Sequence, residues 1–110
     1  MNIGVDAEQA AAIFFENLGF RVVAHRFKTP YGEIDLIVSN DELIVFVEVK
    51  YRKHFSSSVE SISSRQQSRI RNAAEIFISK HNDLCMNKDF RFDALIFDSN
   101  LNNEHIMNCF

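Results

Sequence analysis

The run Leu43–Val49 is apolar at every position except Glu48. β-Branched and aromatic residues dominate it, which predicts a β-strand, and apolar residues on both faces place that strand in the middle of a sheet. Glu48 and Lys50 stand two residues apart and therefore share one face of the strand. A charge buried in a strand costs several kcal/mol unless it is paired or binds a metal ion. We therefore expect a functional site at this end of the strand.

The segment Gly32–Ile37 has the composition of a second strand, and the turn-forming residues Ser39–Glu42 separate the two strands. A hairpin loop of two or four residues centred on Asn40-Asp41 is expected to pair Ser39 with Glu42. That register places Asp35 opposite Phe46 and diagonal to Glu48. Diagonal neighbours have backbones roughly 7–8 Å apart, so two carboxylates there can converge on one divalent cation. The residues expected on the shared face are Glu33, Asp35, Phe46, Glu48 and Lys50.

Metal-assisted hydrolysis of a phosphodiester needs this set of side chains. Mg²⁺ and Mn²⁺ take oxygen ligands, often only one or two carboxylates together with several waters. Such a metal polarises a phosphate oxygen and lowers the pKa of a bound water. In this interpretation Asp35 and Glu48 bind the metal, and Lys50 stabilises charge on the phosphate or orients the attacking water. The alternative is structural: Glu48 and Lys50 form an ion pair at the end of the sheet, and Asp35 makes a hydrogen bond near the turn.

The spacing of Asp35 and Glu48-Val49-Lys50 resembles the PD-(D/E)xK signature of restriction-endonuclease-like nucleases. Over nearly the whole chain, the sequence resembles the YraN-like family of small bacterial proteins, which is related to Holliday-junction resolvases. The positions that carry this resemblance are Glu8, Gly32–Ile37, Phe46–Lys50, Arg52, Ala73-Ala74 and Arg91-Phe92-Asp93. The resemblance implies a nuclease-type α/β fold and a Mg²⁺ or Mn²⁺ site at Glu8, Asp35 and Glu48, beside the lysine. It also favours branched DNA as the substrate class.

Two departures from the family pattern concern residues near this site. The family usually has Lys in the helix after the strands, and Gln66 stands there as a candidate catalytic residue. Ile34 replaces the Pro that usually precedes the metal-binding Asp, as is normal for this family. Gln66 is four residues before Ile70 of the apolar helix stripe, so it either reaches the site or closes a capping box with Ser63. Glu8 also has a structural alternative, because a Glu in the first turn of a helix interacts favourably with the helix dipole.

The net charge of −3 argues at first against a nucleic-acid partner, but the charges are unevenly distributed. Residues 1–49 carry three basic and eight acidic side chains, whereas residues 50–80 carry seven basic and two acidic ones. A positive stripe beside an acidic site suits a metal-dependent nuclease, because the stripe meets phosphates while the cation neutralises the carboxylates. The predicted nucleic-acid-binding residues are Arg52, Lys53, Arg65, Arg69 and Arg71. The alternative is that these basic residues are only solvated.

The hydrophobic spacing predicts one α/β domain over residues 1–110, with a central mixed sheet flanked by helices in the order αβββαβ. The resemblance makes this a restriction-endonuclease-like nuclease domain. The pattern does not identify a partner for Asp93, and the nearby Arg91 is the candidate for an ion pair. Helices are expected over Asp6–Leu18, capped by Asp6 and Gln9, and from Ser63 or Ser64 to about residue 81. Strands are expected over Phe20–Thr29, Gly32–Ile37, Leu43–Val49 and Phe90–Asp98, with a short edge strand within Glu104–Phe110. A Ser-rich loop is expected over Lys53–Ser61 and a polar connection over His81–Asp89.

No apolar run approaches the ~20 residues of a membrane span, and no charged-then-apolar leader precedes Gly4. We therefore expect a cytoplasmic protein without a membrane partner. Cys85 and Cys109 have no C-x-x-C neighbour and are expected to be reduced, and the four histidines lack ligand spacing. The predicted function is metal-dependent cleavage of DNA, by a homodimer if two strands are cut. The alternative is a non-catalytic nucleic-acid-binding or adaptor module that keeps the nuclease fold.

Overall fold

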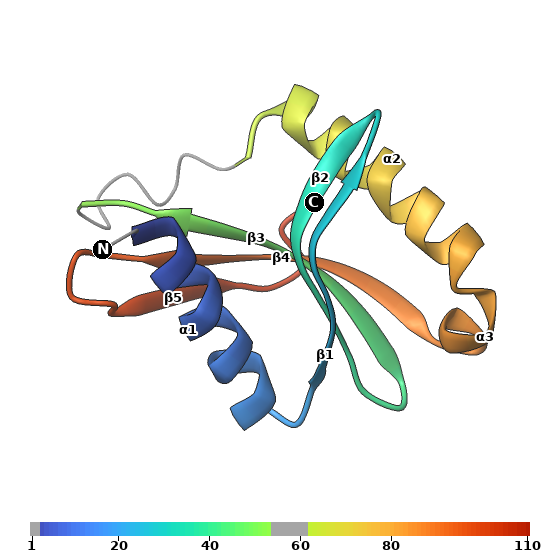
Figure 1. Cartoon of the computed structure of the whole chain (residues 1–110), viewed down its shortest axis with the longest axis horizontal. Coiled ribbons are helices and arrows are strands. Elements are labelled where there is room, and N and C mark those ends of the chain that lie inside the picture. The colour runs from blue at the N-terminus through green and yellow to red at the C-terminus, as the bar shows by residue number, and fades with distance from the viewer. Residues whose placement is uncertain (1–2, 54–61) are drawn as a thin grey trace.

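A computed structural model describes residues 3–53 and 62–110, with side chains from Ala7 onward. The Ser-rich loop expected after Lys53 lies outside the described residues, at positions 54–61. The elements follow in the order α1 (Ile3–Asn17), β1 (Arg21–Thr29), β2 (Gly32–Ser39), β3 (Leu43–Tyr51), α2 (Ser64–Lys80), α3 (Asn82–Cys85), β4 (Asp89–Phe97) and β5 (Asn103–Ile106) (Figure 1). This order confirms the predicted αβββαβ arrangement and its additional C-terminal strand.

Two differences from the sequence prediction concern the helices, whereas the strand ends lie within two residues of the predicted ones. The first helix begins at Ile3, so Asp6 lies inside the helix and is not its N-cap. The expected polar connection after α2 contains the one-turn helix α3, which buries Cys85 against the core under α2. Both differences lie at the ends of helices, where sequence signals are weakest. Neither alters the order of the strands.

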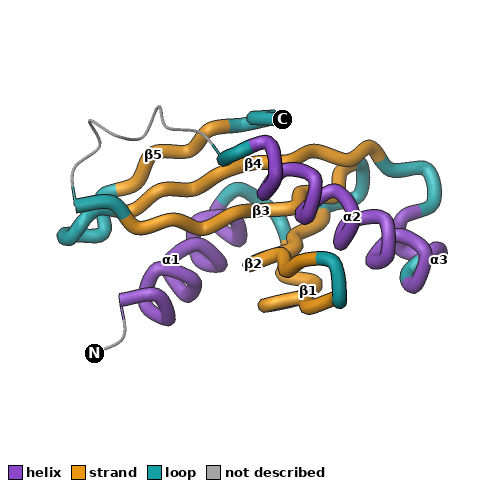
Figure 2. The backbone as a smooth tube through the Cα atoms, turned by 90° about the horizontal axis from the view of Figure 1, so that it is seen from above, coloured by secondary structure: helices purple, strands orange, loops and turns teal. Residues whose placement is uncertain are grey.

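The five strands form one mixed sheet in the order β1-β2-β3-β4-β5. Strands β3 and β4 are parallel, and the other neighbouring pairs are antiparallel. Strand β2 pairs with the first part of β3, from Ser39 to Leu36, and then leaves it together with β1. The far part of the β1–β2 hairpin therefore rises steeply away from β3, β4 and β5 (Figure 1), and Figure 2 views it nearly end-on. This architecture is compatible with a restriction-endonuclease-like fold. No helix in the described ranges is both long and apolar enough to cross a membrane.

Each face of the sheet has its own apolar core. On one face, Phe15 and the buried alanines of α1 pack against side chains of β2, β3 and β4 such as Leu36 and Val47. On the other face, the buried stripe of α2, including Phe77, packs against Ile37 and Phe46. The central strands are therefore covered on both sides, as the apolar run at Leu43–Val49 predicts.

The register of the β2–β3 hairpin differs from the predicted one by two residues. Ser39 pairs with Ile44 rather than with Glu42, and Ile37 rather than Asp35 lies opposite Phe46. The Asn40 side chain causes this difference. Its Oδ1 accepts hydrogen bonds from the backbone N–H groups of Glu42 at 2.9 Å and Leu43 at 2.8 Å. This Asx-type turn places Asp41 and Glu42 at the tip of the loop, and the backbone N–H of Asn40 donates to the carbonyl oxygen of Leu43 at 3.0 Å. A shift of two residues leaves every side chain on its expected face, because a strand alternates with period two.

Gly32 fixes how the β1–β2 hairpin meets α2. A Cβ atom built at this position would lie 2.5 Å from the backbone carbonyl oxygen of Arg69, which is too close for any side chain. Gly32 is buried at the first position of β2. The hairpin therefore packs directly on the α2 backbone, and this contact holds the N-terminal part of α2 near β2 and β3.

A buried carboxylate at Asp93 ties the C-terminal segment to the sheet. Arg91 donates to both Asp93 oxygens at 2.8 Å, which confirms the predicted ion pair. His105 Nε2 lies 2.8 Å from Oδ2, and the backbone N–H of Asn108 donates to Oδ1 at 2.9 Å. The His105 ring also packs edge-on against Phe14 of α1, with centroids 5.2 Å apart. These contacts give Arg91 and Asp93 a structural role.

Candidate active site

Asp35 lies where β2 separates from β3. The β2–β3 ladder runs from Ser39 to Leu36, and β2 then continues toward Gly32 paired with β1. The Asp35 carboxylate fills the gap at this fork, because its Oδ2 accepts a 2.9 Å hydrogen bond from the backbone N–H of Val49. A strand carbonyl would otherwise satisfy that donor. This hydrogen bond holds the Asp35 carboxylate at the backbone of Val49, the residue that follows Glu48.

Glu48 receives contacts from two sides. Its Oε1 accepts a 3.0 Å hydrogen bond from Nε2 of Gln66 and lies 3.7 Å from Nζ of Lys50. The Glu48 side chain is 11% exposed and the Lys50 side chain 17%. Both are therefore largely buried charges at the end of β3, and the structure brings them to the same place as Asp35.

The position of Gln66 settles the two alternatives that its sequence leaves open. Ser63 is the N-cap of α2, and its hydroxyl oxygen accepts a 3.1 Å hydrogen bond from the backbone N–H of Gln66. The Gln66 side chain does not turn back to complete a capping box but reaches Glu48. The Ser63 cap fixes the first turn of α2, and this turn places the side-chain amide of Gln66 within hydrogen-bonding distance of the Glu48 carboxylate.

The pKa values of the two carboxylates are raised. Burial is the largest cause for Glu48, and together with the neighbouring Asp35 charge it raises the pKa from 4.5 to about 7, although Lys50 opposes the rise. Burial also raises the pKa of Asp35, against the hydrogen bond from Val49, and the charges of Glu8 and Glu33 add to the rise. Two neighbouring carboxylates in a low-dielectric setting disfavour their charged forms. Such perturbed groups are typical of functional sites.

Glu8 lies at the edge of this group. Its Oε1 accepts a 2.8 Å hydrogen bond from Nε of Arg26, and its side chain is 21% exposed. Arg26 lies in β1 between two residues that pair with β2, His25 and Phe27. Its backbone is left-handed, with a φ of 48°. No sequence pattern predicts this contact, because Arg26 and Glu8 are 18 residues apart. Within the part of the chain that the structure describes, no three His, Cys, Asp or Glu side chains are grouped so as to hold a metal ion.

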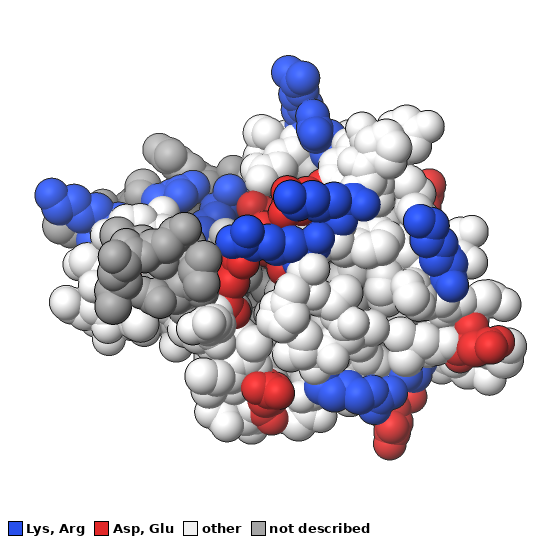
Figure 3. Space-filling view, in the orientation of Figure 1, with Lys and Arg blue, Asp and Glu red and all other residues white. Residues whose placement is uncertain are grey.

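The predicted phosphate-binding residues fall into two classes. Lys53, Arg65 and Arg69 are exposed, whereas Arg52 is half-buried and donates from Nη1 to the carbonyl oxygen of Tyr51 at 2.9 Å. Arg71 is exposed as a residue, and its guanidinium lies over the rings of Phe92 and Phe110. On the face seen in Figure 3, Lys and Arg side chains surround a group of Asp and Glu side chains near the centre. The charges expected of a phosphate-binding surface thus lie next to acidic residues.

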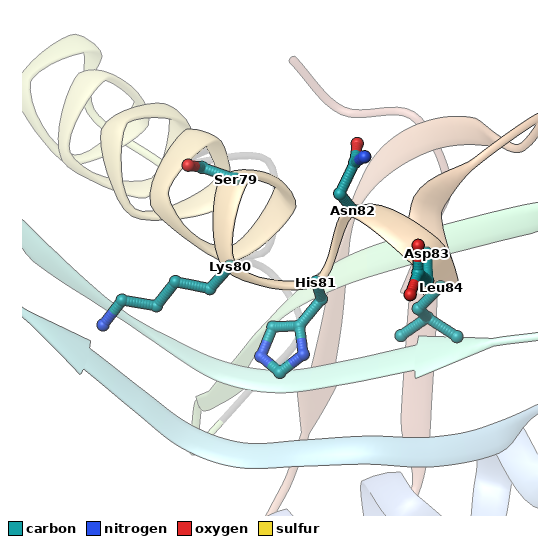
Figure 4. A pocket seen from close by; sticks show the side chains of 6 residues that line it. All are labelled: Ser79, Lys80, His81, Asn82, Asp83 and Leu84. Carbon is teal, nitrogen blue, oxygen red and sulfur yellow. The ribbon is translucent and has the colours of Figure 1, made fainter.

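A separate cavity of about 400 Å³ lies at the corner between α2 and α3. Its lining residues are consecutive, from Ser79 to Leu84, and their side chains point in different directions rather than toward one point (Figure 4). The His81 ring stacks on Phe77 with centroids 4.3 Å apart. This cavity has no set of converging polar groups, so Asp35 and Glu48 remain the better candidate for chemistry.

Comparison with known proteins gives a consistent family match. A family model described as "Uncharacterised protein family UPF0102" matches residues 7–97. UPF0102 proteins of Rhodopseudomonas palustris and Nitrobacter winogradskyi are 42% and 36% identical to the chain over 107 residues, which cover 97% of this chain and 82% and 90% of the relatives. A UPF0102 protein of Azorhizobium caulinodans is 39% identical over the same share of the chain and 81% of its own length. These matches confirm the resemblance to the YraN-like family, which is UPF0102.

Proposed function

The chain belongs to the uncharacterised protein family UPF0102, and we propose that it is a metal-dependent endonuclease that hydrolyses phosphodiester bonds in DNA. The observation that carries the proposal is the meeting of Asp35 and Glu48 at the fork between β2 and β3, with Lys50 and Gln66 beside them. Two carboxylates, an ammonium group and a neighbouring basic surface are the groups that this reaction needs.

The donor set fits Mg²⁺ or Mn²⁺. The two carboxylates supply hard oxygen ligands. Burial, with a smaller contribution from neighbouring carboxylates, raises their pKa values, and a bound divalent cation would offset the cost of holding them ionised there. Asp35 and Glu48 would hold the ion, with Glu8 as a third ligand if it leaves Arg26. A bound ion would polarise a phosphate oxygen and lower the pKa of a water.

The other side chains have distinct roles in this proposal. The Val49 N–H orients Asp35, and the Gln66 amide holds Oε1 of Glu48 in place. Lys50 stabilises the negative charge that develops on the phosphate. The exposed Arg65 and Arg69 contact the DNA backbone without regard to sequence.

A second function is favoured by two specific observations. Arg26 occupies the Glu8 carboxylate, and Gln66 stands where the family usually has a charged Lys. Both features weaken a catalytic centre while leaving the basic surface intact. They support a non-catalytic nucleic-acid-binding or adaptor module with the same fold as the alternative.

The two functions are separated by a cleavage assay on a panel of labelled single-stranded, duplex, flap and four-way DNAs with Mn²⁺. The nuclease proposal expects cleavage of at least one substrate by the wild type, and loss of it in Asp35→Asn and Glu48→Gln. Glu42→Gln, which changes an exposed carboxylate in the hairpin loop, serves as the control and should cleave normally. Binding of several DNAs without any cleavage would replace the nuclease with the adaptor module. Paired cuts in both strands would call for the predicted homodimer, which sedimentation with DNA tests.

A further inference from the structure

Four phenylalanine rings, from β3, β4 and the C-terminal segment, form a ladder on the face of the sheet that α2 covers. The centroids are 6.2 Å apart for Phe90 and Phe46, 5.2 Å for Phe46 and Phe92, and 5.0 Å for Phe92 and Phe110. The planes of neighbouring rings differ by only 26–30°. Phe90, at one end of the ladder, is 41% exposed. The two inner pairs are stacked and the Phe90–Phe46 pair is tilted. An apolar core does not require the exposure of the last ring.

A pocket of about 220 Å³ opens beside this ladder. Phe46, Phe90 and Phe92 form its aromatic wall, and two exposed residues of α2, Arg71 and Glu75, are its charged groups. The Arg71 guanidinium is held over the rings of Phe92 and its neighbour Phe110, 5.4 Å from each centroid. The volume is below the roughly 300 Å³ at which drug-sized sites begin, so it suits one flat ring system rather than a larger ligand.

We propose that this pocket binds a single unpaired nucleobase of the DNA substrate, with Arg71 on the adjoining phosphate. The proposal rests on the function proposed above and names its substrate class: DNA with unpaired nucleotides next to the cleaved bond. Every base has an aromatic face that can stack on Phe90, and stacking of this kind is largely independent of sequence. Arg71 complements the phosphate, and the Glu75 carboxylate accepts hydrogen bonds from base amino groups. A paired base in a duplex cannot enter without leaving its stack.

The pocket lies within a few nucleotides of the candidate active site. Phe46 and Glu48 share one face of β3 two residues apart, which corresponds to about 6.6 Å along the strand. Along α2, the nine residues from Gln66 to Glu75 span about 13–14 Å. At about 3.4 Å per stacked nucleotide, these distances correspond to about two to four nucleotides.

The segment that carries Phe110 is fastened to β4 beside the pocket. Cys109 donates to the carbonyl oxygen of Phe92 twice, from its backbone N–H at 2.8 Å and from its thiol at 3.4 Å. The backbone N–H of Asn108 donates to Oδ1 of the buried Asp93 at 2.9 Å. These hydrogen bonds hold the Phe110 ring in the ladder, next to the ring of Phe92.

The test measures binding without cleavage, in EDTA, by fluorescence anisotropy of a labelled single-stranded 12-mer and of the matching duplex. Phe90→Ala is expected to weaken single-strand binding about fivefold or more, which equals the lower end of base-stacking energies, about 1 kcal/mol. Duplex binding should change less than twofold. Ile13→Ala removes a comparably exposed apolar side chain, from α1, and should change neither. Phe90→Tyr should restore single-strand binding, because its ring stacks equally well.

A double-mutant cycle makes the contact specific. Each base of the 12-mer is replaced in turn by an abasic site. At one position, loss of the base should weaken binding to the wild type about as much as Phe90→Ala does. The same abasic site should have little further effect on binding to Phe90→Ala. Glu75→Gln, which leaves the aromatic wall intact, should reduce a preference for oligo-dC over oligo-dT. A folded Phe90→Ala protein with wild-type single-strand affinity would overturn the inference alone. A wild type that binds neither DNA would overturn the proposed function as well. A wild-type dimer that Phe90→Ala converts to a monomer, with DNA affinity unchanged, would assign the pocket to a second copy of the chain instead.

Discussion

Replacing Glu48 by Gln is expected to stabilise the metal-free protein at pH 8. The amide oxygen of Gln can still accept the hydrogen bond from Gln66, and the substitution gives up only the 3.7 Å ion pair with Lys50. It removes a negative charge held next to Asp35 on a side chain that is only 11% exposed. The charge is unfavourable there because burial and the second carboxylate both oppose ionisation.

The size of the effect follows from the pKa. Burial and, to a smaller extent, the Asp35 charge raise the pKa of Glu48 from 4.5 to about 7, so between these pH values the native protein binds more protons than the unfolded chain. The stability of the wild type therefore falls as the pH rises through this window, and is lowest once the pH exceeds the native pKa. At about 1.4 kcal/mol per pKa unit, the loss at pH 8 is about 3 kcal/mol. Below the unfolded pKa the carboxyl is protonated in both states, so wild type and Glu48→Gln should converge.

Urea unfolding in EDTA at pH 4.5, 6 and 8 measures this difference as a change in the free energy of unfolding. We expect Glu48→Gln to be more stable than the wild type by about 1–3 kcal/mol at pH 8, with the difference disappearing toward pH 4.5. Glu16→Gln, which changes an exposed side chain of α1, should track the wild type at every pH. A Glu48→Gln protein that is less stable than the wild type at pH 8 would refute the reasoning. It would show that Glu48 and Lys50 form a structural ion pair.

Three further predictions concern single residues. Lys50→Ala should lower the single-turnover rate of DNA cleavage with Mn²⁺ by roughly 10²-fold or more while leaving DNA affinity nearly unchanged, because the ammonium acts on the transition state; the wild-type rate in this variant would contradict its role. Arg65→Ala should weaken binding to all DNA sequences alike and reduce the salt slope of log K by up to about 1, whereas an unchanged slope would mean that this side chain is only solvated. Gly32→Ala should cost about 2 kcal/mol or more in urea unfolding, because the added Cβ would lie 2.5 Å from the Arg69 carbonyl oxygen; a neutral result would mean that α2 moves freely away from the hairpin.

The shared face of Asp35, Glu48 and Lys50 could be predicted because strand alternation does not depend on the details of the turn. The register could not be predicted in the same way, since a loop tip at Asn40-Asp41 and one at Asp41-Glu42 keep the same faces. The Asn40 side chain decides between them through two hydrogen bonds to the backbone. The sequence therefore located the candidate site but placed Asp35 opposite the wrong residue of β3.

The contacts between distant parts of the chain are what the sequence could not supply. The Arg26–Glu8 ion pair and the His105–Asp93 contact join residues 18 and 12 positions apart, and no local pattern marks them. The ladder from Phe46 to Phe110 likewise depends on how β4 and the C-terminal segment pack beside β3. Helix capping was a partial exception, because Ser63 signals the start of α2 and so brings Gln66 within reach of Glu48.

Mn²⁺ binding, measured by electron paramagnetic resonance as the loss of free-ion signal, tests the central claim most directly. The variant to compare is Asp35→Asn, because the amide oxygen of Asn can keep the hydrogen bond from the Val49 N–H and so preserve the fold. We predict that the wild type binds Mn²⁺, that Asp35→Asn binds it at least about tenfold more weakly, as expected when a ligating carboxylate is lost, and that Glu42→Gln binds like the wild type. Equal Mn²⁺ affinity in the wild type and Asp35→Asn, or no binding by a folded wild type, would contradict a metal centre at Asp35 and Glu48.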